Sequence, residues 1–166
     1  MQDISLEELT KIKGIGIVKA IQIKAVCEMA KRISKPLNAN KVQIRSSASV
    51  ANLLMNEMKY EKREKVKVLV LNTKNVLIKI IDVSYGGTNS AIIEPKDILA
   101  EPIKMGAPKI ILVHNHPTGV LHPSKPDEEL TKKIVGAGKI LDIRLLDHLI
   151  ISEDTYFSFA DEGIIL

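Results

Sequence analysis

The chain has 166 residues, which is enough for one full domain and a short appendage but not for two full domains. Hydrophobic residues make up 45% of it and charged residues 27%, a balance that excludes a disordered protein. No apolar run approaches the roughly 18 residues of a membrane span, and the first residues lack the pattern of a secretory signal. The single cysteine, Cys27, excludes an internal disulfide and a cysteine-based zinc cage, so we expect a protein of the reducing cytoplasm.

The net charge of +4 is unevenly distributed along the chain. Residues 1–45 hold nine Lys/Arg against four Asp/Glu, a charge of +5, and the other residues have a charge of −1. Any attraction to phosphate therefore begins in the first quarter of the chain. The aromatic content of 3% argues against a platform that stacks single-stranded bases.

Residues 1–35 predict two helices joined by a tight turn. Ser5 and Glu8 form a capping-box pattern that begins the first helix, and Gly14-Ile15-Gly16 marks the turn. The second helix is expected from about Val18 to Ile33, with an apolar stripe formed by Ile21, Ala25, Met29 and Ile33. The polar residues 36–45 are interpreted as a linker. An N-terminal segment of this length rarely has a stable core of its own, and we expect the helical segment 1–35 to pack against another surface.

The following residues, 46–166, alternate between helix and strand patterns, which predicts an α/β domain with a mixed sheet and helices on its faces. The expected helices cover 50–58, 97–105 and 126–141. The expected strands cover 66–71, 76–83, a short segment at 90–93, 109–113, 145–151 and 156–159.

A histidine pair follows the apolar run Lys109–Val113, at the end of a predicted buried strand, where α/β sheets usually bind ligands. His114 and His116 are two residues apart and can direct both imidazoles to one point. Asp127 in the first turn of the next helix can add a carboxylate. Two histidines and one carboxylate leave a fourth position for water, which is the pattern of catalytic zinc.

Simpler explanations exist for the same residues. Ser124-Lys125-Pro126-Asp127 also matches a helix capping box, and a His-x-His pair also arises by chance. The capping and metal interpretations are compatible, because a cap can hold the carboxylate in place. His122 and His148 are assigned no function, since most single histidines are satisfied core or surface groups.

The spacing His114-x-His116, seven residues, Ser124-x-x-Asp127 resembles the JAMM motif of JAB/MPN-type metalloproteases. Three segments are closer still to the bacterial RadC family: 71–75 (LNTKN), 111–117 (ILVHNHP) and 145–151 (LLDHLII). This resemblance implies a cytidine-deaminase-like α/β/α fold over residues 46–166 and zinc held by His114, His116 and Asp127. It also implies that Ser124 supports the reaction oxyanion and that a glutamate just before the first strand is the general base.

Three glutamates, Glu57, Glu61 and Glu64, precede that strand. The RadC pattern places the acid immediately before the strand and thus selects Glu64. Strand alternation agrees, because Glu64 is in phase with Val66 and Val68. The alternative is a solvated charge in a Glu-Lys-Arg-Glu-Lys run.

The N-terminal turn resembles a helix-hairpin-helix element, which RadC proteins also contain. Gly14 and Gly16 would let backbone N–H groups approach a phosphate, with Lys19 nearby on the following helix. The alternative is an ordinary glycine turn between packed helices. Such hairpins usually work in pairs, and one is present here.

Three functions follow from these patterns. The first is a zinc-dependent hydrolase of peptide or isopeptide bonds, acting on a peptide or protein substrate. The second is a DNA-associated binding module in which the hairpin makes weak phosphate contacts and the metal is structural. The third, a zinc nucleoside deaminase, fails because the His-x-Glu and Pro-Cys-x-x-Cys ligand set is missing.

Overall fold

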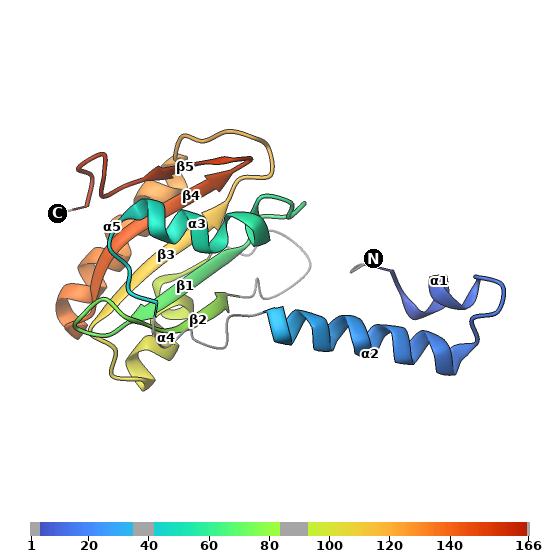
Figure 1. Ribbon diagram of the computed structural model, residues 1–166. Helices are drawn as coiled ribbons and strands as arrows, with labels where there is room; N and C mark the ends of the chain where they lie inside the picture. The colour runs from blue at the N-terminus through green and yellow to red at the C-terminus, as the bar shows by residue number, and fades with distance from the viewer. Residues whose placement is uncertain (1–3, 35–41, 84–92, 166) are drawn as a thin grey trace. The chain divides into compact units, whose positions relative to one another are not determined.

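The computed structural model describes residues 4–34, 42–83 and 93–165 (Figure 1). The chain divides into two compact units, Met1–Asn38 and Ala39–Leu166. Among the described residues, no helix combines the length and the apolar character needed to cross a membrane.

The first unit is a helical hairpin formed by α1 (Leu6–Thr10) and α2 (Ile17–Ser34). The predicted capping box is present, with Ser5 accepting from the Glu8 N–H and Glu8 accepting from the Ser5 N–H. Leu9 and Ala20 are buried between the helices, whereas Ile21 and Met29 of the predicted apolar stripe are exposed within this unit. These two side chains stay exposed because α1 has only five residues and covers little of α2, and the side chain of Ile33 lies outside the described residues.

The second unit is built on a five-stranded mixed sheet. Its strands in chain order are β1 (Val66–Leu71), β2 (Leu77–Val83), β3 (Lys109–Asn115), β4 (Arg144–Ser152) and β5 (Thr155–Ser158). The spatial order is β2-β1-β3-β4-β5, and β3 and β4 run parallel while the other neighbouring strands are antiparallel.

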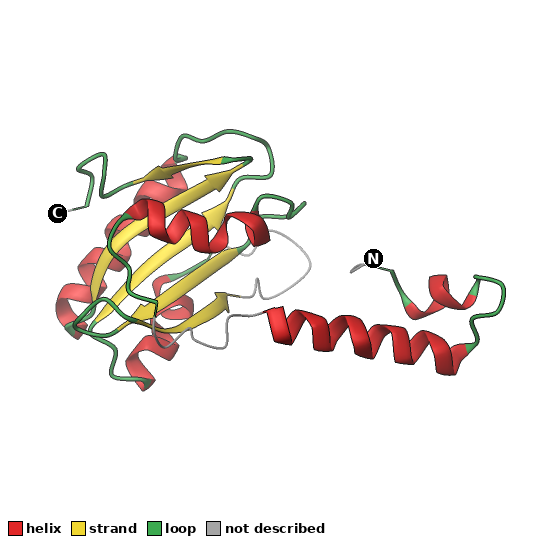
Figure 2. Cartoon of the chain, in the orientation of Figure 1, coloured by secondary structure: helices red, strands yellow, loops and turns green. Residues whose placement is uncertain are grey.

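Helices cover both faces of this sheet and create two apolar cores (Figure 2). Helix α3 (Ser47–Met58) lies on one face, and α4 (Pro95–Lys104) and α5 (Lys125–Leu141) lie on the other (Figure 1). Strand β1 is buried on both sides: Leu69 and Leu71 belong to the α3 core, and Val66, Val68 and Val70 belong to the core under α4 and α5. The predicted α/β domain with a mixed sheet is therefore confirmed.

The turn between β1 and β2 explains why these strands pair directly. Asn75 adopts a positive φ of 58°, and the Asn72 side chain accepts hydrogen bonds from the backbone N–H groups of Lys74 and Val76. Asparagine tolerates both roles better than most residues, so the Asn-Thr-Lys-Asn segment closes the hairpin.

The end of the predicted linker packs on the sheet. Ile44 is buried in the α3 core and donates its N–H to the Asn75 carbonyl, and Val42 accepts from Leu77 N–H. Ile44 and the partly buried Val42, two apolar residues in a polar stretch, thus join the domain. Most of the strand expected at 90–93 lies outside the described residues.

Candidate metal centre

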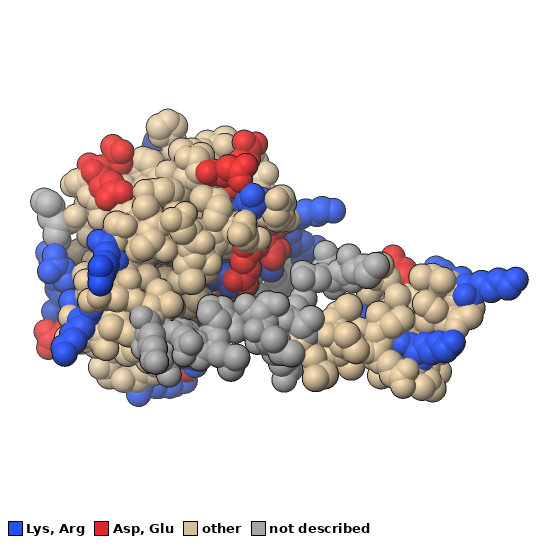
Figure 3. Space-filling view, in the orientation of Figure 1, with Lys and Arg blue, Asp and Glu red and all other residues tan. Residues whose placement is uncertain are grey.

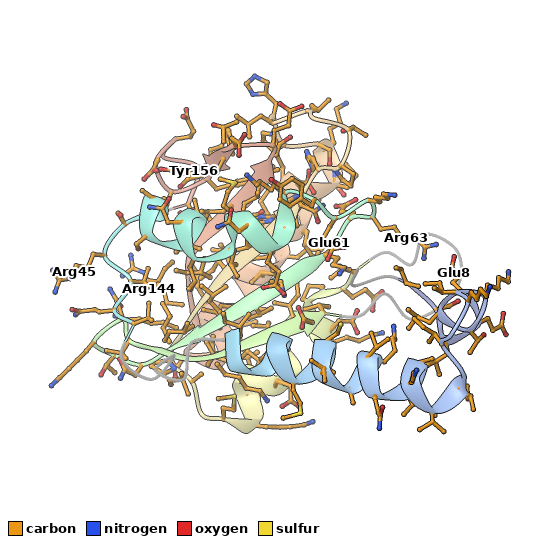
Figure 4. All side chains as sticks on the ribbon, turned by 45° about the vertical axis from the view of Figure 1, so that its right-hand side comes forward. Glu8, Arg45, Glu61, Arg63, Arg144 and Tyr156 are labelled. Atoms are coloured by element: carbon orange, nitrogen blue, oxygen red, sulfur yellow. The ribbon has the colours of Figure 1, made fainter. Side chains whose placement is uncertain are left out.

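Four predicted side chains converge at the C-terminal end of β3. Each of Glu64, His114, His116 and Asp127 offers a ligand atom, and these atoms all lie within 4.8 Å of one another. The loop between α3 and β1, which carries Glu64, lies at this end of the sheet, where Figure 4 shows Glu61 and Arg63, while Arg45 and Arg144 lie at the other end. The fold thus brings together the four residues that the sequence motif predicted.

Strand alternation aims the two imidazoles at α5. His114 is in phase with Ile110 and Leu112, which pack in the core under α4 and α5. His116 follows two residues later, directly after β3 ends. Asp127 comes from the first turn of α5, the helix that covers this face. The three groups therefore meet where the strand and the helix N-terminus approach each other.

The two imidazole nitrogens and the Asp127 carboxylate have the spacing that a tetrahedral metal requires. His114 Nε2 lies 3.0 Å from His116 Nε2 and 3.3 Å from Asp127 Oδ1, and His116 Nε2 lies 3.5 Å from Asp127 Oδ2. Two ligands about 2.0–2.1 Å from tetrahedral zinc would be about 3.3 Å apart. These residues therefore fit a zinc ion with three protein ligands.

The hydrogen atoms of His116 can be assigned from its partner. His116 Nδ1 lies 2.7 Å from the Val120 carbonyl oxygen, which only accepts, so Nδ1 carries the hydrogen. In the neutral ring, Nε2 then presents a lone pair to the cluster. Burial lowers the pKa of His114 to about 4, so this ring is neutral near pH 7. The hydrogen bond with Asp127 raises the pKa of His116 despite partial burial, so protonation of this ring is favoured where no metal is bound, and its charge then faces the carboxylate.

Asp127 is held by the capping box that begins α5. Its Oδ2 accepts from the Ser124 N–H at 2.7 Å and from the Ser124 hydroxyl at 2.6 Å, which leaves Oδ1 to face His114. Burial raises the pKa of this carboxyl, but the hydrogen bond with His116, the nearby His114 and the Ser124 donors outweigh burial. The resulting pKa lies well below its usual range, so Asp127 is ionised at neutral pH. The predicted cap and the predicted ligand coexist in one residue.

Strand pairing places Glu64 beside His116. In the β1–β3 pairing Val66 lies opposite His114, and Lys65 and Asn115 continue the ladder through the Asn115 N–H and the Lys65 carbonyl. Glu64 is therefore the next residue of β1's register, facing His116. The other two candidate glutamates lie elsewhere: Glu61 pairs with Lys65, and Glu57 pairs with Lys67.

The Glu64 carboxyl has the environment of a proton acceptor. Much of its side chain is exposed, but its carboxyl end is part of the cluster. Partial burial raises the pKa of this carboxyl, and the neighbouring Asp127 carboxylate raises it further, while His116 opposes the shift. Glu64 also lines a cleft of about 390 Å³, whose walls are formed by Glu57, Arg63, Glu64, Lys65, Val66, Lys67, Asp82 and Val83.

Three supporting residues were not identified from the sequence. Asn115, between the two histidines, is buried and clamps the loop that carries Glu64: it accepts from the Lys65 N–H and donates to the carbonyls of Glu61 and Arg63. His148, given no function in the sequence analysis, and Thr131 lie behind His114. A polar residue in an otherwise apolar strand was the signal for Asn115 and His148.

The residues predicted to contact DNA, Gly14, Gly16 and Lys19, lie together in the first unit. Gly14 has a positive φ of 89°, and neither Gly14 nor Gly16 has a neighbouring atom within 4 Å of where a Cβ would be. The Lys19 ammonium donates to the Gly14 carbonyl at 3.1 Å. Figure 3 shows Lys and Arg side chains projecting from the α1–α2 unit.

Comparison with known proteins gives one consistent family. Residues 44–164 match the model of the RadC-like JAB domain. A UPF0758 protein of Clostridium botulinum (strain Okra / Type B1) is 47% identical over 161 residues, which covers 97% of this chain and 71% of the relative. A UPF0758 protein of Alkaliphilus metalliredigens is 43% identical over 164 residues, covering 99% of this chain and 71% of the relative.

The clamp by Asn115 gives a first prediction. Asn115→Ala removes three hydrogen bonds, each with a net value of about 1 kcal/mol, so we expect the free energy of unfolding to fall by about 2–3 kcal/mol. The Lys65 amide should also exchange faster with solvent, since it loses its side-chain acceptor. Chemical denaturation and amide exchange measure both effects, with Asn52→Ala on the exposed side of α3 as the control. Unchanged Lys65 exchange would contradict the clamp.

Proposed function

Because the chain belongs to the RadC family of JAB/MPN-type domains, we propose that it is a zinc-dependent hydrolase of peptide or isopeptide bonds. The observation that carries the proposal is the convergence of His114 Nε2, His116 Nε2 and the two Asp127 carboxylate oxygens, at distances of 3.0–3.5 Å, beside the Glu64 carboxyl. A metallohydrolase-like fold and a group of residues able to hold a metal support it.

His114 Nε2, His116 Nε2 and Asp127 Oδ1 would hold the metal. Two imidazoles and one carboxylate are a donor set that suits zinc. Zinc bound in this way supplies Lewis-acid polarisation of a substrate carbonyl and a water molecule activated near neutral pH.

Glu64 acts in this proposal as the general base and then as the general acid. Its carboxylate accepts a proton from the attacking water and returns that proton to the leaving amine. The raised pKa makes the Glu64 carboxylate a stronger base for the first step, and it increases the fraction of protonated Glu64 near neutral pH that the second step needs. In this proposal the adjoining cleft of about 390 Å³, which Glu64 lines, takes part of the peptide or protein substrate.

The main role of Ser124 is to hold the Asp127 carboxylate, and contact with the reaction oxyanion is a second role. Its hydroxyl hydrogen is donated to Asp127 Oδ2. A direct role at the oxyanion, as the family resemblance implies, requires this hydroxyl to turn from Asp127 toward the substrate. We therefore assign Ser124 the positioning of the carboxylate and propose the oxyanion contact as its second role.

Metal content tests the ligand set. Elemental analysis of protein purified without added zinc should give about one zinc per chain, as expected for a three-ligand site. His114→Ala, His116→Ala and Asp127→Ala should each lose the metal, because two remaining ligands bind weakly. His122→Ala is the matched control, since His122 is exposed and its ring lies near Phe157, outside the cluster. Full zinc content in the three ligand variants would refute the assignment.

A second variant separates the base from the ligands. Glu64→Gln keeps the size of the side chain but cannot accept a proton near neutral pH, so it should retain zinc while hydrolysis slows by about 10²–10⁴-fold. The rate is measured on whichever peptide or isopeptide-linked protein first gives a zinc-dependent signal. Glu61→Gln is the control and should keep its activity, because Glu61 pairs with Lys65 outside the cluster. An active Glu64→Gln enzyme would remove Glu64 from the mechanism.

A second candidate function, weak DNA binding, is favoured by the glycine turn of the first unit. Gly14 and Gly16 are open to a close approach by phosphate, and the segment 1–45 has a charge of +5.

Binding measured as a function of salt tests this candidate. We expect weak binding at low salt, and Lys19→Ala should lower the salt dependence of the logarithm of the affinity by about one unit per lost phosphate contact. Lys132→Ala, at an exposed position of α5, should leave the salt dependence of the affinity unchanged. Equal effects of the two substitutions would mean that the turn makes no specific phosphate contact.

A further inference from the structure

A buried histidine of β4 lies directly behind the candidate metal centre. His148 Nε2 is 2.8 Å from His114 Nδ1, and His148 Nδ1 is 2.6 Å from the Thr131 hydroxyl oxygen. The Thr131 hydroxyl in turn donates to the Asp127 carbonyl at 2.7 Å. A chain of three hydrogen bonds therefore connects two residues of the metal site through two side chains that do not belong to it.

The direction of every hydrogen bond in this chain follows from its last acceptor. The Asp127 carbonyl only accepts, so the single Thr131 hydroxyl hydrogen is donated there. Thr131 must then accept from His148 Nδ1–H, which leaves His148 Nε2 without a hydrogen in the neutral ring. His148 Nε2 therefore accepts from His114 Nδ1–H. This series of hydrogen bonds leaves His114 Nε2 with a free lone pair that faces Asp127 Oδ1.

His148 is itself fixed on all sides. Its backbone N–H donates to Asp147 Oδ1 at 2.7 Å, and its ring stacks on Phe159 with centroids 4.7 Å apart and planes inclined by 10°. The residue is completely buried, so neither ring nitrogen has water as an alternative partner. Such a ring cannot rotate without leaving a buried donor or acceptor unsatisfied, which is costly.

We propose that His148 is a positioning residue that holds His114 in the tautomer and ring orientation that can bind a metal, and that Thr131 sets the direction of this hydrogen-bond chain. The inference rests on the proposed function in that His114 is taken as a metal ligand. Partners of this kind raise the affinity of a metal site because they orient the ligand before the metal arrives. They also raise the basicity of the ligand nitrogen.

The test compares zinc affinities of the full chain by competition with a chromophoric chelator. His148→Phe keeps the ring volume and the stacking on Phe159 but has no ring nitrogen, and we expect zinc to bind about 10–100-fold more weakly. Thr131→Val should weaken binding in the same direction, whereas Thr131→Ser keeps the hydroxyl and should restore affinity. His122→Phe, an exposed histidine outside the chain of hydrogen bonds, should not change affinity.

A second measurement does not depend on the metal. Nitrogen-15 NMR of the imidazole rings in metal-free protein should show the hydrogen of His114 on Nδ1, and this preference should weaken in Thr131→Val. If His148→Phe does not fold, the Thr131→Val and Thr131→Ser pair decides the question.

The outcomes separate the two proposals. Wild-type protein that binds no zinc would refute the proposed function, and the NMR tautomer would still test the hydrogen-bond chain. Wild-type zinc affinity in His148→Phe, or a His114 hydrogen on Nε2 in the metal-free protein, would refute the role of His148.

Discussion

The candidate site depends on one constraint: the nitrogen and oxygen atoms that could bind a metal must be held within about hydrogen-bond distance of one another. His114, His116 and Asp127 are each fixed by a hydrogen bond on the side that faces away from the cluster. The Val120 carbonyl holds one ring, the Ser124 hydroxyl holds the carboxylate, and a second buried histidine holds the other ring. Because each outer contact also decides which atom faces inward, these contacts orient a group of residues that could hold a metal ion.

The same constraint explains why a central strand carries the site. The pairing of β1 with β3 fixes the height of Glu64 relative to His116, and Asn115 fastens the loop that precedes β1. A shift of one residue in this pairing would turn Glu64 toward the α3 face and away from the histidines. Both strands are buried on both sides, so such a shift would also exchange side chains between the two apolar cores and disturb the packing of each. The apolar cores therefore set the register, and the register sets the position of Glu64 relative to the histidines.

The sequence predicted the parts of this arrangement that depend on local periodicity. These parts are short-range patterns: the two-residue spacing of His114 and His116 at the end of β3, the capping box at Ser124, and the phase of Glu64. The structure brings these residues together. The supporting contacts could not be predicted in the same way. His148 reaches His114 across two parallel strands, 34 positions apart, and which face of each strand meets α5 becomes known only from the assembled sheet. Polar residues in buried strands were the visible sign, but their partners were not.

The two units differ in what their sequences can hold in place. The described part of the first unit buries only Leu9 and Ala20 among its hydrophobic residues, whereas the second unit has two apolar cores. All four residues of the metal cluster and all of their described hydrogen-bond partners belong to the second unit. Rigid geometry matters for a metal site because its ligands must be placed to within a fraction of an ångström, whereas phosphate contacts through exposed glycines and a lysine tolerate motion. The candidate metal site thus lies in the unit with two apolar cores, whereas the DNA contacts proposed for the basic hairpin do not require such dense packing.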